Sequence, residues 1–296
     1  MSCAVSPSSR LTYGVQRVCR VWRVPRSSFY DWKRRSKDSQ SSARRGPKPV
    51  TSDEEIASEI RKILGMVEDS FGFRGEGYRK VHARLHFAGH AITKRRVNRI
   101  MRESGLLAPC RRGTPRGPRA HDGTITTDTP DAMWGTDATQ VWTSEEGLVW
   151  VFAATDHCTA ELVGTHASTI GTRFEALVPV QEAVRERFGS LDQGVASGLS
   201  LRHDHGTQYM SKHFQREIRF WGIESSPSFV RAPEGNGIAE RMMRTLKEQV
   251  LHVRNFKDAE EVRVALAEFR QVYNAELLIG RHGYRSPPSV RREQAA

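Results

Sequence analysis

The chain has 296 residues, of which 38% are hydrophobic and 27% are charged, and its formal net charge is +12. No stretch approaches the roughly 18 unbroken apolar residues that a membrane helix needs, and the N-terminus lacks the apolar block of a signal peptide. The four cysteines (Cys3, Cys19, Cys110 and Cys158) form no C-x-x-C pair, which argues against a disulfide framework or a zinc finger. We therefore expect a cytoplasmic globular protein with no membrane partner.

The positive charge is concentrated in the first part of the chain. Residues 1–120 contain 27 Lys and Arg against 10 Asp and Glu, whereas residues 121–296 contain 19 against 24. A strongly basic segment is typical of a domain that binds a polyanion, although a solvated, solubilising surface would give the same count. The slightly acidic remainder predicts another use for its carboxylates, and metal binding is one candidate.

Polar segments rich in Pro, Gly, Ser or Arg divide the chain. The predicted organisation is a short helical segment at 1–35, a linker at 36–52, a basic helical DNA-binding domain at 53–108, a second linker at 109–130, a catalytic core at 131–275 and a tail at 276–296. The first segment resembles part of a helix-turn-helix, and a plain helical hairpin is an equal alternative.

The apolar period of the basic domain predicts three helices, the first capped by Asp53 and the third by Thr93. Arg95, Arg99 and Arg102 share one face of the third helix. A short basic helix of this kind, placed after a glycine-containing turn, fits a recognition helix in the major groove of DNA. The alternative is a solvated basic surface. We therefore expect an all-helical, helix-turn-helix-like region before the core.

From Met133 onward the period changes to that of strands. A meander of three strands is expected first, with the third strand starting at Cys158 and a helix at 172–188 after it. Short strands then alternate with helices, the last two at about 238–253 and 258–273. This order predicts an α/β fold with a ribonuclease-H-like core, in which helices flank a mixed five-stranded sheet.

Three acidic residues lie where this order of elements would bring them together. Asp137 lies in the first strand, Asp204 follows the fourth strand, and Glu240 lies near the start of the long helix, with 35 residues between the last two. Two Mg²⁺ ions about 3.5–4 Å apart can stabilise the attacking and leaving oxygens of phosphodiester transfer. Mg²⁺ prefers oxygen ligands, and clustered carboxylates repel one another unless a cation neutralises them. We therefore expect a metal site.

The motifs around these acids resemble those of the D, D, 35, E superfamily of transposases and retroviral integrases. The segments WGTD, HDHGTQY and APEGNGIAERMMRTLKE occur in the same order, and Lys247 follows Glu240 by seven residues, as in insertion-sequence transposases of the IS-three type. The resemblance covers roughly residues 53–290. It implies a catalytic, metal-binding triad of Asp137, Asp204 and Glu240 with two Mg²⁺ or Mn²⁺ ions. Water would cut one strand at an element end, and the freed 3′-OH would attack DNA.

The resemblance also implies partners. Proteins of this family act on double-stranded DNA in the bacterial cytoplasm, at the nucleoid. Self-association and an upstream-frame partner are expected as well, because the downstream-frame product commonly works joined to an upstream one. No leucine heptad is visible in this sequence, which fits a downstream-frame product alone.

Two residues depart from the simplest form of this pattern. His205 stands where the family often has Asn, and it either ligates metal weakly or hydrogen-bonds nearby; we favour the second. Asp156, at the end of the second strand, is a rival acid, but an Asp at a strand end is more often a turn or cap residue.

The long helix offers two cations beside Glu240. At about 100° per residue, Glu240, Arg244 and Lys247 lie within about 60° of one another, opposite an apolar stripe that ends at Val253. We expect Arg244 and Lys247 to hold DNA phosphates beside the metal ions, with surface ion pairs as the alternative.

Two other functions fit parts of the sequence. One is a catalytically idle DNA-binding regulator derived from a transposase, which the intact triad disfavours. The other is a nuclease of the same fold that cuts RNA–DNA hybrids, which the basic helical domain and the 35-residue spacing disfavour.

Overall fold

The computed structural model describes residues 4–37, 51–65, 73, 75–109, 125–228 and 236–294. The chain divides into two units, Met1–Ser52 and Asp53–Ala296. Most of both predicted linkers lies outside the described residues. Across the described ranges, no helix is long and apolar enough to cross a membrane.

The first unit contains two short helices, α1 (Val15–Val21) and α2 (Arg26–Lys37). Its large apolar side chains are mostly exposed: Trp22 and Trp32 keep 62% and 66% of their surface accessible. Since few apolar side chains are covered, this helical pair gains little stability from its own core.

The second unit begins with the helices α3 (Asp53–Ile63), α4 (Tyr78–Phe87) and α5 (Lys94–Glu103). They enclose their own hydrophobic cluster, and the Thr93 hydroxyl accepts from the Arg96 amide at 3.3 Å, which confirms the predicted cap of α5. Asp53 does not precede α3 as the predicted cap. It is the first residue of α3, and its carboxylate accepts hydrogen bonds from Arg96 and Arg99 on α5.

The core of the second unit is a five-stranded mixed sheet with the order β3-β2-β1-β4-β5. Strands β3, β2 and β1 are antiparallel neighbours, whereas β1, β4 and β5 run parallel. The strands are β1 (Met133–Thr143), β2 (Gly147–Asp156), β3 (Leu162–Ser168), β4 (Ser200–His203) and β5 (Glu224–Pro227).

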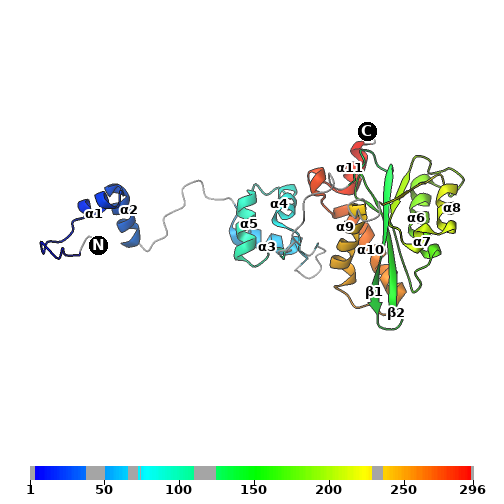
Figure 1. Cartoon of the computed structure of the whole chain (residues 1–296), viewed down its shortest axis with the longest axis horizontal. Coiled ribbons are helices and arrows are strands. Elements are labelled where there is room, and N and C mark those ends of the chain that lie inside the picture. The colour runs from blue at the N-terminus through cyan, green and yellow to red at the C-terminus, as the bar shows by residue number, and fades with distance from the viewer. Residues whose placement is uncertain are drawn as a thin grey trace. The chain divides into compact units, whose positions relative to one another are not determined.

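Helices cover both faces of the sheet (Figure 1). One face packs against α6 (Arg173–Phe188), α7 (Thr207–Met210) and α8 (Lys212–Phe220), through a buried cluster that includes Trp134 and Phe152. The other face packs against α9 (Gly237–Leu246) and α10 (Ala259–Glu276), through a cluster that includes Val151 and Met243. Alternation along each strand sends successive side chains to opposite layers.

Three elements differ from the sequence prediction. The long helix ends its regular turns at Leu246 and continues as a π-helical segment, η2 (Lys247–Leu251), in which the His252 amide donates to the Lys247 carbonyl at 2.9 Å. The wider turn places both Val250 and Leu251 in the core and leaves Val253 37% exposed, so the predicted stripe ending at Val253 is wrong.

The other two differences lie at the β2–β3 connection and at the C-terminus. Cys158 belongs to a turn, and β3 starts only at Leu162, because Ala160 adopts a left-handed φ of 60° that no strand accommodates. The predicted tail contains a 3₁₀ turn, η3 (Gly280–His282), and the helix α11 (Pro287–Gln294).

Candidate active site

Asp137 lies in the middle of the sheet, on β1. Its Cα pairs with that of Ala153 on β2, and its Oδ1 accepts from the Ala138 amide at 2.8 Å. Burial raises the pKa of Asp137 to about 6, and repulsion from Asp204 and Glu240 adds to this, while Lys247 acts in the opposite direction. The other two predicted acids and the predicted cation are therefore all within electrostatic reach of Asp137.

Asp204 follows β4, which runs parallel to β1 with Gly135 opposite Arg202. Adjacent parallel strands end at the same edge of a sheet, so the residue after β4 lies beside the middle of the longer β1. The Asp204 side chain is exposed, and its Oδ1 accepts from the Gly206 amide at 2.8 Å in a tight turn. This turn fixes the carboxylate near the strand end.

Glu240 lies in the first turn of α9, a helix that packs on β1 and β2. Ala239 and Met242 are buried against the sheet, whereas Glu240 is exposed beside it. A carboxylate in the first helical turn is also stabilised by the helix dipole. The register of the buried stripe therefore decides which way Glu240 faces.

The Asp204 and Glu240 carboxylates both act on Asp137, but the three are not arranged as a closed metal site. Within the part of the chain that the structure describes, no group of three or more His, Cys, Asp and Glu side chains is arranged to hold a metal ion. The chemistry of the donors nonetheless fits a hard divalent cation, because all three are carboxylates. A cation would also remove the repulsion that contributes to the raised pKa of Asp137.

The start of α9 is held by a buried polar contact that no sequence motif indicated. Asn236 is buried directly before α9, and its Nδ2 donates to the Thr136 carbonyl on β1 at 3.2 Å. Its Oδ1 and the Nε2 of buried His157 have no hydrogen-bond partner among the described residues. Both atoms face Gly135, where an added Cβ would lie 2.6 Å from His157 Nε2 and 3.1 Å from Asn236 Oδ1.

His157 is neutral, and its Nε2 is an unprotonated ring nitrogen. Its Nδ1 donates to the Ile125 carbonyl at 3.0 Å, which leaves Nε2 without a proton. Burial lowers the pKa of His157 to about 4, and the charges of Arg202 and Arg281 lower it further. Only a residue without a side chain fits at position 135, so Gly135, His157 and Asn236 together set the approach of α9 to β1. Glycines stand on both sides of Asn236 in the sequence, which is compatible with a close approach, but nothing in the sequence marked His157.

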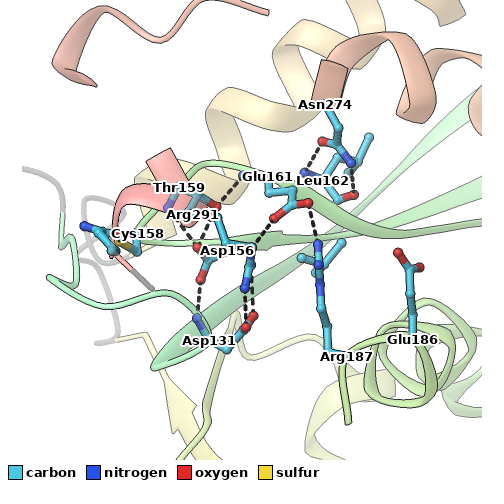
Figure 2. A network of polar contacts seen from close by, with 12 residues as sticks. Asp131, Asp156, Cys158, Thr159, Glu161, Leu162, Glu186, Arg187, Asn274 and Arg291 are labelled. Atoms are coloured by element: carbon cyan, nitrogen blue, oxygen red, sulfur yellow. Dashed lines mark hydrogen bonds and ion pairs between the residues drawn. The ribbon is translucent and has the colours of Figure 1, made fainter. Parts of the chain in front are cut away.

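Asp156 has a structural role, as its strand-end position indicated. Its carboxylate accepts from the Thr159 amide at 2.8 Å, the Thr159 hydroxyl at 2.7 Å and the Asp131 amide at 3.1 Å (Figure 2). Arg291 of α11 binds Asp131 and Glu161 in the same network. These bonds close the β2–β3 turn and fasten the C-terminal helix to the sheet, so Asp156 is occupied away from Asp137.

His205 and the two predicted phosphate-binding cations occupy different environments. The His205 Nε2 bonds to the Ser228 carbonyl at 2.7 Å, in agreement with the hydrogen-bonding interpretation. Arg244 is exposed on α9, and Lys247 is half-buried at the start of η2. Lys247 acts electrostatically on Asp137 and therefore lies on the triad side of the helix.

The three arginines predicted to contact DNA are not equivalent. Arg95 and Arg102 are exposed on α5. Arg99 instead binds Asp53 at 2.7 Å and Glu103 at 2.9 Å. Its charge is already compensated, and a phosphate would have to compete with two carboxylates for it.

Comparisons with known proteins agree with this architecture. Residues 53–114 match the family described as an HTH-like domain, and residues 221–287 match the integrase core domain. The chain is 29% identical over 289 residues to the transposase InsD for insertion element IS2A/D/F/H/I/K of Escherichia coli, a match that covers 96% of this chain and 92% of the relative. InsD of insertion element IS2-9 from strain K12 is equally similar, with 96% and 91% covered.

Two solved structures are similar at lower levels. The simian T-cell lymphotropic virus intasome in complex with a PP2A regulatory subunit matches with 18% identity and a TM-score of 0.46, over 73% of this chain and 74% of that one. The HTLV-2 integrase catalytic core in complex with magnesium matches with 15% identity and a TM-score of 0.40, over 55% and 97%.

An HTH-like domain followed by an integrase core defines a polynucleotidyl transferase whose ligand is DNA. Within that class, the chain is similar to the transposases of insertion elements, and the predicted ribonuclease-H-like fold and the predicted function in transposition are confirmed. The integrase-core match begins at residue 221 and therefore does not include Asp137 or Asp204.

Proposed function

We propose that the chain is a DDE-type DNA transposase in which Asp137, Asp204 and Glu240 hold two Mg²⁺ or Mn²⁺ ions. The observation that carries this proposal is electrostatic: the carboxylates at the end of β4 and in the first turn of α9 both act on Asp137 of β1, whose pKa is raised to about 6, mainly by burial. Like charges gathered beside a sheet reduce stability, and functional sites are where such arrangements persist. Bound ions would stabilise the attacking and leaving oxygens of the phosphodiester.

The remaining residues position DNA. Arg244 and Lys247 extend from α9 and η2 beside the triad, where they would hold phosphates next to the scissile bond. Arg95 and Arg102 on α5 would contact DNA outside the core, with Arg99 joining them only if it leaves Asp53. The DNA partners are the element ends and the target.

The domain boundaries and the protein partners belong to the same proposal. We place the DNA-binding domain at 53–108 and the catalytic core at 131–275. Self-association and an upstream-frame protein would complete the assembly, in a bacterial cytoplasm at the nucleoid.

The substitution Asp204→Asn tests the triad. It removes one charged ligand while leaving the fold and the phosphate contacts in place, so strand transfer should fall by about 10³-fold or more. DNA affinity in the absence of metal should stay within about twofold. Addition of Mg²⁺ should raise the melting temperature of the unsubstituted chain and have little effect on the variant, because ligand binding stabilises only the form that binds it.

Asp192→Asn is the matched control, because it removes the same charge from an exposed loop. It should leave strand transfer, DNA affinity and the response to Mg²⁺ unchanged. Full strand transfer by Asp204→Asn would show that the triad is assigned wrongly. Salt-dependent DNA binding by the unsubstituted chain, without metal-dependent joining, would instead favour the catalytically idle regulator.

A further inference from the structure

Helix α9 presents a second charged face next to the one that carries Glu240. Arg241 follows Glu240 directly and is exposed. Together with Arg281 of η3 it lines a cavity of about 1120 Å³ that does not include Glu240 or Lys247. Arg244 also lines this cavity, and its position on the helix borders both faces.

Arg281 is fixed in the cavity wall by bonds to uncharged groups, and among the described residues no carboxylate hydrogen-bonds to it. Its Nη2 donates to the carbonyls of His157 at 2.7 Å and Cys158 at 2.5 Å, and its Nε donates to the His282 ring at 3.1 Å. Carbonyl and imidazole acceptors orient a guanidinium but do not cancel its charge. The side chain is therefore held in a single position, and Asp156 offsets its charge only from a distance, without a hydrogen bond.

Arg241 and Arg281 lie close enough to repel each other. Burial lowers the pKa of Arg281 and the charge of Arg241 lowers it further, while Cys158 and Asp156 act in the opposite direction. A pair of guanidinium groups in a partly dry wall is unfavourable unless an anion joins them. The situation is the reverse of that at Asp137, where carboxylates act on a carboxylate: here a guanidinium acts on a guanidinium.

The other charges around the cavity do not offset these arginines. Lys80 and Arg244 add positive charge. Glu76 is already bound by Arg84 at 2.8 Å and by Lys80 at 3.9 Å, and Glu248 is the other acid in the lining. The cavity as a whole is therefore basic.

We propose that Arg241 and Arg281 form a phosphate-binding site for the backbone of a DNA strand, distinct from the triad. The inference rests on the proposed function, since it takes DNA as the source of the phosphate. Two guanidinium groups bind phosphate oxygens through charge-assisted, often bidentate hydrogen bonds. A strand held there and by Arg244 would run along α9 to reach the face that carries Glu240.

The affinity of the full chain for a labelled, random-sequence DNA duplex tests the site, measured by fluorescence anisotropy without metal between 50 and 300 mM salt. Arg241→Ala should weaken binding by about five- to tenfold near 0.1 M salt and make the slope of log K against log salt shallower by about one. Arg241→Lys keeps the charge and should recover most of the affinity. Arg185→Ala removes the same charge from α6 on the opposite face of the sheet and should change affinity by less than about twofold.

Several results would overturn the site. Equal losses in Arg241→Ala and Arg185→Ala would show that bulk charge, and not this cavity, binds DNA. Unchanged DNA affinity in Arg241→Ala would also reject the site, and if inorganic phosphate binding were lost at the same time, the ligand would be a free anion and not DNA. Because binding is measured without metal, the triad is not involved: an Arg241 effect in a chain that never joins DNA would support the site and reject the proposed function.

Discussion

In the helical region α3–α5 a carboxylate is paired with opposite charges, whereas at the strand-end site of the core a carboxylate lies near like charges. In the helical region, burial alone would raise the pKa of Asp53, but hydrogen bonds and charges from Arg99 and Arg96 bring it below its usual value. In the core, burial and two neighbouring carboxylates raise the pKa of Asp137. Paired charges stabilise a fold modestly, whereas gathered like charges oppose it. The difference separates charges that maintain structure from charges kept for chemistry.

Among the changes that test this contrast, the largest effect is expected at Gly135, where the core site is least tolerant. In Gly135→Ala the new methyl group would lie 2.6 Å from His157 Nε2 and 3.1 Å from Asn236 Oδ1. Displacing Asn236 moves the start of α9, so we expect strand transfer to fall by about 100-fold through misplacement of Glu240. The overpacked contact should lower the free energy of unfolding by about 1–3 kcal/mol. Single-turnover joining assays and urea denaturation measure the two effects.

Gly14→Ala is the control, since a Cβ at that position of the first unit has no neighbour within 4 Å. It should leave strand transfer unchanged. The double variant Gly135→Ala/His157→Ala should recover part of the lost activity, because removal of the imidazole gives the methyl group room. Normal activity in Gly135→Ala would mean that the approach of α9 to β1 does not limit the placement of Glu240.

Removing one acid from each region should change stability in opposite directions. Asp53→Ala leaves Arg96 and Arg99 without a shared carboxylate and should lower the free energy of unfolding by about 1–2 kcal/mol. Asp137→Asn relieves repulsion and should raise it, in chelator, by about 1–2 kcal/mol. Urea denaturation gives the sign, and hydrogen exchange of the α3 and α5 amides localises the Asp53 effect. Destabilisation by both variants would contradict the contrast between the regions.

The contrast also explains what the sequence could predict. The order of strands and helices along the chain and the buried stripe of α5 follow from local periodicity, because burial repeats with the period of each element. The positions of Asp137, Asp204 and Glu240 follow from that order, since each acid stands at a defined place on its strand or helix. The assignment of these acids as the catalytic triad stays a prediction.

Contacts between residues far apart in the chain could not be predicted from the sequence. Arg99 is 46 residues from Asp53, and Arg291 is 160 residues from Asp131. No local pattern links such partners, so Arg99 looked like a DNA contact and α11 like a tail. The π-helical turn at Lys247–Leu251 was missed for a related reason, because it depends on how Val250 and Leu251 pack in the core.

The smallest predicted effect is a dependence of stability on pH. Its sign for Asp137 in the core is opposite to its sign for Asp53 in the helical region. The folded pKa of Asp137 is about 6, against 3.8 as its usual value, so the folded state holds the proton more tightly. Its contribution is therefore most favourable below pH 4 and is lost as the pH rises to 6. The pKa of Asp53 is lowered, so its contribution is present above pH 3.8 and is lost on acidification.

Urea denaturation in chelator at pH 4.5, 5.5 and 7 can isolate the Asp137 contribution. The difference in stability between Asp137→Asn and the unsubstituted chain should grow across this range and level off above pH 6. Subtracting the variant removes the contribution of Asp156, whose pKa burial also raises. Saturating Mg²⁺ should shrink the difference at pH 7, because a bound cation favours the ionised carboxylate. A difference that stays constant from pH 4.5 to 7 would mean that folding does not raise the pKa of Asp137, and the carboxylates would then not be held against one another without metal.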